Sequence, residues 1–166
     1  MAKHSAFDWT KLIVAVVACQ LIGNLGAVFT IPSLSTWYAL LNKPSFNPPN
    51  WIFGPVWIIL YTLMGISLYL AWKEFPRLKK TSRDKAALLF AFQLALNLLW
   101  SYLFFGLRSP LYGLICIALL WVAILATMLE FYGISRNAAL ALLPYILWVS
   151  FAAMLNLSIL ILNPGI

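Results

Sequence analysis

The side chains with the most chemical potential in this chain are uncharged amides and indoles set inside long apolar runs. Gln93, Asn97 and Trp100 recur every three or four residues, so a helix would place them on one face. Trp57 and Trp148 lie more than one helical turn inside two other runs. Indoles stack and amides hydrogen-bond, so such a set could line a pocket for a flat, largely apolar ligand. In the plainer alternative, the amides join helices and the aromatic rings serve packing.

Acidic and basic side chains are missing from the centres of these runs. Proton-coupled pumps usually bury such groups as relays, so the pattern weighs against that class. The one histidine, His4, has no partner ligands nearby, and both cysteines lie inside apolar runs. We therefore expect no metal site, no cofactor, no disulfide and no catalytic residue. The acidic residues all fall at the ends of runs: Asp8, Glu74, Asp84 and Glu130.

The elements that must position these residues are membrane-spanning helices. The 166 residues are 64% hydrophobic and only 9% charged, whereas soluble domains are about 25% charged. A span needs about 20 apolar residues, and five runs qualify: 10–31, 51–72, 86–107, 110–130 and 138–162. We predict an all-α membrane protein, one five-transmembrane-helix bundle over residues 1–166, with a long first loop at 32–50. In that loop, residues 35–41 could form a short interfacial helix.

The distribution of positive charge predicts an orientation. The net charge is +7, but the basic residues form no aromatic-interleaved stripe that would bind nucleic acid. Nine of the eleven lysines and arginines lie at the amino end and in the second and fourth connections, while Lys43 and Arg108 lie on the other side. By the positive-inside rule, the amino end is cytoplasmic and the carboxyl end is outside. We expect contact with membrane lipid and no nucleic-acid partner.

The third run presents small residues on the face opposite its polar side chains. Ala87, Ala91 and Ala95 have the spacing that lets two membrane helices approach closely. They could form the packing face of a homodimer, or they could pack against another helix of the same chain.

Several short motifs occur in a recognisable order along the chain. They are Trp37-Tyr38, Leu41 to Pro44 and Pro48-Pro49 in the first loop, Gly54-Pro55-Val56-Trp57 in the second span, Gln93 to Asn97 with Trp100 in the third, and Pro144-Tyr145 with Trp148 and Leu155-Asn156 in the fifth. In this order the chain resembles the translocator protein family, also called tryptophan-rich sensory proteins or peripheral-type benzodiazepine receptors.

The resemblance implies a five-helix bundle, often dimeric, whose pocket opens toward the first loop. It implies binding of porphyrins such as protoporphyrin IX, of synthetic isoquinoline and benzodiazepine ligands and, in animals, of cholesterol. The animal sterol motif needs a tyrosine and a basic residue where this chain has Leu157 and Ile161, so the chain looks more like a prokaryotic member in a cell membrane. The ligand-binding positions that carry over, with Tyr112 replacing a family tryptophan, are Gly23, Ala27, Trp57, Gln93, Asn97, Trp100, Tyr112, Tyr145, Trp148, Ala152 and Leu155.

The expected function is therefore a membrane receptor or sensor that binds tetrapyrroles, with transport of the ligand left open. One alternative is light-dependent porphyrin degradation that uses the pocket tryptophans, and another is a structural membrane protein without a small ligand. For a porphyrin, we expect the apolar macrocycle between the helices and the two propionates at the loop, near Lys43. Lys43 could instead extend to lipid headgroups.

Overall fold

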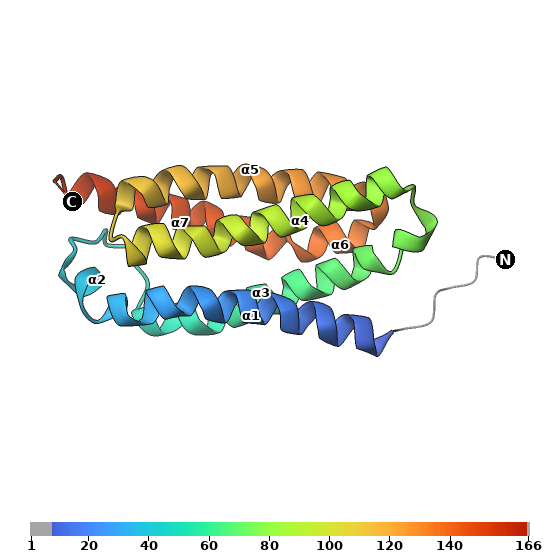
Figure 1. Cartoon of the computed structure of the whole chain (residues 1–166). Helices are drawn as coiled ribbons and strands as arrows, with labels where there is room; N and C mark the ends of the chain where they lie inside the picture. The colour runs from blue at the N-terminus through green and yellow to red at the C-terminus, as the bar shows by residue number, and fades with distance from the viewer. Residues whose placement is uncertain (1–7, 166) are drawn as a thin grey trace.

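Five long helices make up an elongated bundle (Figure 1). The structure is a computed structural model that describes residues 8–165, so Lys3 and His4 lie outside the described residues. The long helices are α1 (Trp9–Leu34), α3 (Asn50–Trp72), α4 (Lys80–Ser101), α5 (Pro110–Ile134) and α7 (Leu143–Leu162). Each belongs to a segment that is long and apolar enough to cross a membrane. The predicted fold class, an all-α five-helix bundle, is confirmed.

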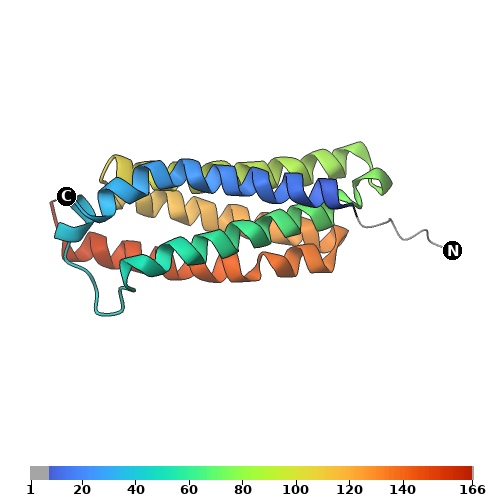
Figure 2. The same ribbon diagram turned by 90° about the horizontal axis from the view of Figure 1, so that it is seen from below.

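Four short helical segments connect the long ones. α2 (Trp37–Leu40) lies in the first loop, and a 3-10 turn (Phe75–Arg77) follows α3. A π-helical turn (Tyr102–Gly106) extends α4, and α6 (Arg136–Ala141) leads into α7. The end of α1 that adjoins α2 lies beside the end of α7, at the end of the bundle opposite the connection between α3 and α4 (Figures 1 and 2). We call this end the α2 end.

Local hydrogen bonds explain where several helices begin. Asp8 caps α1 by accepting a hydrogen bond from the backbone N–H of Lys11 at 3.1 Å. That hydrogen bond lowers the pKa of the Asp8 carboxyl, since it favours the ionised form. Ser109 caps α5 in the same way, with Pro110 at the first helical position. The sequence predicts this second cap, because serine followed by proline satisfies the free end of a helix without losing a hydrogen bond.

Two glycines bring α1 and α3 into close contact in the middle of the bundle. A Cβ atom added to Gly65 would lie 2.5 Å from the Cα of Val16, and one added to Gly23 would lie 2.4 Å from the ring of Tyr61. The side-chain amide of Gln20 also donates to the Ile58 carbonyl and to the Thr62 hydroxyl, both at 2.9 Å. Small residues permit such close packing, which is the main attraction between helices in lipid.

The first loop is folded and packs on the α2 end. Tyr38 is only 2% exposed, and its hydroxyl donates to Asn47 at 2.7 Å. The backbone N–H of Asn42 donates to the side chain of Asn163, whose amide donates back to the Asn42 carbonyl, both at 2.9 Å. These contacts attach the loop to the end of α7. The interfacial helix expected at 35–41 is present as the shorter α2.

Candidate functional site

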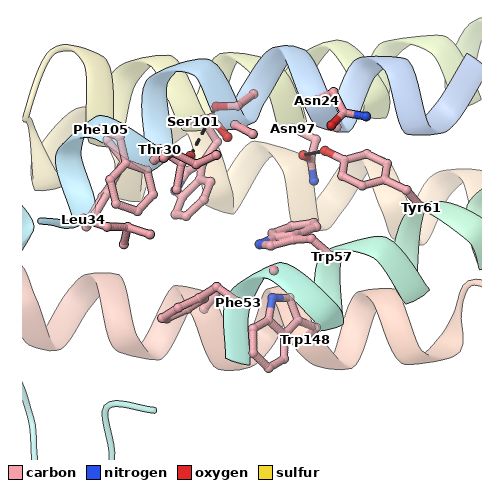
Figure 3. A pocket seen from close by; sticks show the side chains of 18 of the residues that line it. Asn24, Thr30, Leu34, Phe53, Trp57, Tyr61, Asn97, Ser101, Phe105 and Trp148 are labelled. Carbon is pink, nitrogen blue, oxygen red and sulfur yellow. Dashed lines mark hydrogen bonds between the residues drawn. The ribbon is translucent and has the colours of Figure 1, made fainter. Parts of the chain in front are cut away.

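A cavity of about 310 Å³ lies inside the α2 end of the bundle, among α1, α3, α4 with its π turn, and α7. Figure 3 shows aromatic side chains on both sides of it, with Trp57, Phe53 and Trp148 on one side and Phe105 on the other. The volume is at the lower end of the range of ligand sites, and the lining is mainly apolar with a few polar groups. Eight predicted residues line it: Gly23, Ala27, Trp57, Asn97, Trp100, Trp148, Ala152 and Leu155.

Asn97 joins three helices at the cavity wall. Its side-chain oxygen accepts a hydrogen bond from the Tyr61 hydroxyl of α3 at 2.5 Å. Its amide nitrogen donates to the Tyr145 hydroxyl of α7 at 2.8 Å. Tyr145 is fully buried and does not line the cavity, so its part is to hold Asn97. This amide is therefore occupied with joining helices, as the plainer sequence alternative proposed.

Asn156 has the same role nearer the loop. Its side-chain oxygen accepts from the indole N–H of Trp100 at 3.3 Å, and its amide donates to the Pro110 carbonyl at 2.8 Å. These bonds connect α7 to both α4 and α5. The Trp100 ring is then fixed against Phe104, with 5.4 Å between the ring centroids.

Gln93 is buried one helical turn from Asn97 but does not line the cavity. The residue is 0% exposed, and neither polar atom of its side chain has a hydrogen-bond partner among the described residues. Burying an unpaired amide costs free energy. The resemblance predicts ligand contact for Gln93, but the structure places the residue behind the cavity wall.

The indoles of Trp57 and Trp148 offer hydrogen-bond donors to the cavity. The Trp57 ring packs near Tyr61, and the Trp148 ring packs edge-on to Phe53 at 6.1 Å. Neither indole N–H has a hydrogen-bond partner within residues 8–165. Figure 3 shows both rings at the cavity. The arrangement can stack on a flat ring and donate hydrogen bonds to an acceptor on it.

The π turn supplies lining residues that sequence reasoning missed. The backbone N–H of Leu107 bonds to the carbonyl of Tyr102 at 2.8 Å, five residues back. The turn buries Phe104 and Phe105, and both line the cavity. The hydroxyl of Ser33 in α1 donates to the Phe105 carbonyl at 3.0 Å and ties α1 to the turn. Such turns often occur at functional sites, but no simple residue pattern predicts them.

Comparison with known proteins identifies the family. The sequence profile described as the TspO/MBR family matches residues 15–162, which is most of the chain. The chain belongs to the TspO/MBR family. It is 48% identical over 153 residues to the tryptophan-rich protein TspO of Archaeoglobus fulgidus, covering 92% of this chain and 97% of the relative. It is 38% identical to protein CrtK of Rhodobacter capsulatus over 94% of each chain. It is 38% identical to the translocator protein of Bos taurus, covering 89% of this chain and 87% of that protein.

Family membership confirms the resemblance found in the sequence. Together with the five apolar helices, it makes the chain an integral, multi-pass membrane protein of the TspO/MBR family. The structure differs from what the resemblance implied about the pocket mouth. Tyr38 of α2 lines the cavity and is almost fully buried, so the first loop closes the end at which an opening was expected.

Tyr112, one of the positions carried over from the resemblance, does not line the cavity of this TspO/MBR protein. The side chain is 53% exposed and contributes to a shallow apolar groove on the outside of α4 and α5. Its neighbour Gly113 faces inward instead, where an added Cβ would lie 2.8 Å from Phe104. One residue turns a helix by about 100°, so both positions cannot face the same cavity.

Lys43 also lies outside the cavity lining. Its amino group donates to the carbonyls of Leu41 at 3.1 Å and Ala39 at 3.3 Å, and it lies 5.1 Å from the centre of the Tyr38 ring. The side chain thus donates to carbonyls at the carboxyl end of α2. Carbonyl oxygens at the carboxyl end of a helix carry partial negative charge, which favours a cation there. This placement favours a role in folding the loop.

The alanine stripe faces away from the bundle. Ala87, Ala91 and Ala95 are all exposed, so they do not pack against another helix of the same chain. Of the two sequence alternatives, only an external partner for this face stays open.

Proposed function

We propose that this TspO/MBR protein is a membrane receptor that binds a tetrapyrrole, or a ligand of similar flat and apolar shape, in the cavity. The observation that carries the proposal is the pair of indoles, Trp57 and Trp148, whose N–H groups are unpaired beside an aromatic-lined cavity. Burying a macrocycle there would remove apolar surface from lipid or water and add stacking with the rings. Relatives named translocator protein and tryptophan-rich sensory protein support a translocating or sensing role.

The test is a titration of the full chain in lipid nanodiscs with protoporphyrin IX, followed by quenching of tryptophan fluorescence. Trp57→Leu and Trp148→Leu keep the hydrophobicity and remove the aromatic face. Each should weaken binding by about 0.5–1.5 kcal/mol, or about 2- to 13-fold. Trp51→Leu is the matched control, because Trp51 lies on the same helix as Trp57, is 73% exposed and does not line the cavity. Equal affinities for all four proteins would remove the indoles from the site.

Light-dependent degradation of the porphyrin is a second candidate function, favoured by the same two indoles on the cavity wall. Purified protein should then cause porphyrin absorbance to fall in light but not in the dark. The double variant Trp57→Phe and Trp148→Phe should lose this effect while it keeps aromatic stacking. Binding without loss of absorbance supports a receptor or transporter. Absence of both binding and quenching supports the structural alternative.

We also propose that the exposed alanines of α4 form the contact of a homodimer. Small residues let backbones approach, so Ala91→Leu at the centre of the stripe should separate the subunits by steric bulk. Val122→Leu adds less bulk on another exposed helix face and serves as the control. Size-exclusion chromatography with light scattering reports the mass. An unchanged dimer with Ala91→Leu would place the contact elsewhere.

A further inference from the structure

The cavity is open on one side, between α1 and α3. Four of its lining residues are also exposed on the outer surface of the bundle. Asn24 and Ile31 lie on α1, and Ile31 is 66% exposed; Gly54 and Ile58 lie on α3, and Ile58 is 61% exposed. A Cβ added to Gly54 would meet no atom within 4 Å. We call this opening the α1–α3 slot.

The slot ends in the middle of the bundle, where α1 and α3 meet. Gly23 packs on the ring of Tyr61, and the Gln20 amide donates to the Ile58 carbonyl at 2.9 Å. From this contact the two helices diverge toward the α2 end (Figure 2). These contact residues form the closed end of the cavity, and its other residues from α1 and α3 lie within the diverging halves.

The other sides of the cavity are closed by contacts. At the loop, Tyr38 and Leu41 are 2% and 6% exposed, and the Tyr38 ring packs 5.7 Å from that of Phe105. Between α1 and α4, a Cβ on Gly26 would lie 3.1 Å from the Ser101 hydroxyl. Between α3 and α7, the rings of Phe53 and Trp148 are in contact (Figure 3). The slot is therefore a side on which lining residues of the cavity reach the outer surface of the bundle.

The position of the slot decides which solvent it faces. Its four residues lie inside the two membrane-spanning segments, Trp9–Leu34 and Asn50–Arg77, and not in a loop. It therefore faces lipid acyl chains. Asn24 lies at its edge, where its side-chain nitrogen donates to the Gln20 carbonyl at 2.9 Å and its oxygen has no partner in the part of the chain that the structure describes. A polar group exposed to hydrocarbon is costly and usually serves a function.

We propose that the cavity is loaded sideways, through the α1–α3 slot, from the membrane leaflet at the α2 end. The ligand is then a flat amphiphile dissolved in the membrane and carrying a hydrogen-bond donor that the Asn24 oxygen accepts as the ligand passes. A solute that arrives from water would have to displace the folded loop. The chemical nature of the ligand rests on the proposed function, but the slot itself can be tested without any ligand.

The ligand-free test places a thiol inside the cavity and asks which reagent reaches it. Ser101→Cys changes one atom at a residue that is 8% exposed and lines the cavity. The full chain in liposomes is treated with a maleimide on a long acyl chain, or with a sulfonated maleimide that does not enter membranes. Cys19 and Cys116 are buried, so the unmodified chain serves as the blank. We expect labelling by the acyl-chain reagent alone.

Two neighbouring isoleucines of α3 provide a matched pair for the slot. Ile58 and Ile59 are 61% and 59% exposed, but only Ile58 lines the cavity. In the Ser101→Cys background, Ile58→Trp should fill the slot and slow labelling by about tenfold, which is a barrier raised by about 1.4 kcal/mol. Ile59→Trp should leave the rate unchanged. Asn163→Ala, which removes the two hydrogen bonds between the loop and that side chain, should also leave it unchanged.

The opposite pattern overturns the proposal. The sulfonated reagent could instead label the thiol, and Asn163→Ala could accelerate that labelling. This result would place the access route under the loop. Absence of labelling by either reagent, or equal rates for Ile58→Trp and Ile59→Trp, would show that the slot admits nothing.

Porphyrin kinetics then separate this proposal from the proposed function. In nanodiscs, Ile58→Trp should slow both association and dissociation of protoporphyrin IX, while Ile59→Trp should change neither. If no porphyrin binds but the thiol is labelled through the slot, the proposed function fails and the lateral route stands. If porphyrin binds with rates that Ile58→Trp does not change, the lateral route fails and the receptor function stands.

Discussion

Two amides on one face of α4 should respond differently to substitution. Asn97 makes two hydrogen bonds, to Tyr61 at 2.5 Å and to Tyr145 at 2.8 Å. Gln93, one turn away, is equally buried and makes none within the described residues. The sequence gives both residues the same expected role, so the contrast comes from the structure alone.

Asn97→Leu should destabilise the bundle. The substitution removes two interhelical hydrogen bonds, which in membranes contribute about 0.6 kcal/mol on average and up to about 1.7 kcal/mol each. Tyr61 is 5% exposed and Tyr145 is 0% exposed, so neither hydroxyl can turn to water when Asn97 is lost. The unpaired hydroxyls add to the cost, and we expect a total loss of about 1–3 kcal/mol.

Gln93→Met should cause no loss of stability. Methionine is similar in length and flexible enough to fill the same space, and it carries no strong hydrogen-bonding group. Removing an unpaired buried amide recovers its desolvation penalty, so the free energy of unfolding should stay unchanged or rise by up to about 2 kcal/mol.

Reversible unfolding of the full chain in mixed detergent micelles, followed by circular dichroism, gives both free energies under the same conditions. A loss of more than about 1 kcal/mol in Gln93→Met would mean that its amide is hydrogen-bonded in the membrane. An unchanged stability of Asn97→Leu would refute the three-helix network. Either result would contradict the division of roles between the two amides.

Three further predictions concern packing, orientation and the loop. Gly65→Ala should destabilise the protein by about 1–3 kcal/mol in the same unfolding assay, because its Cβ would lie 2.5 Å from the backbone of α1. Gly133→Ala is the control and should not destabilise the protein, because its Cβ would meet no atom within 4 Å. A thiol from Ser82→Cys should react with a membrane-impermeant reagent only from the cytoplasmic side, and one from Ser45→Cys only from outside; the reverse would overturn the charge count. Lys43→Gln should weaken binding of protoporphyrin IX and of its dimethyl ester by the same factor, because the amino group already bonds to loop carbonyls; a loss confined to the free acid would restore the pairing with propionates.

The spans could be predicted from the sequence because the physical signal is local. A run of about 20 apolar residues must form a helix in lipid, since its backbone has no other hydrogen-bond partners there. Ser109 and Pro110 mark the start of α5 for an equally local reason. The helix α4 begins at Lys80, outside the predicted run, because a helix in contact with water needs no apolar residues.

The cavity could be predicted only in part, because its shape depends on contacts between distant residues. Helical periodicity places Asn97 and Trp100 on one face, but it also places Gln93 there, and the structure separates them. The π turn changes which residues after Ser101 face the cavity, and the 3.6-residue period of an α-helix does not predict that change. Likeness of residue type to a family position says nothing about which side of the helix faces inward, and Tyr112 lies on the outer side of α5.

The pairing of the site's polar groups bears on what the cavity can select. Two of the amides that line the cavity, Asn97 and Asn156, are occupied by contacts between helices. In lipid, contact between apolar surfaces contributes little to helix association. Such hydrogen bonds therefore help to fix the distances between the helices around the cavity. A ligand then meets a largely preformed aromatic space, and little binding energy is lost in ordering it. The free indole donors of Trp57 and Trp148 require an acceptor on the ligand, but they fix neither its charge nor its length. Selection by shape and stacking, with one or two hydrogen bonds, therefore favours a class of flat membrane-soluble molecules over any single compound.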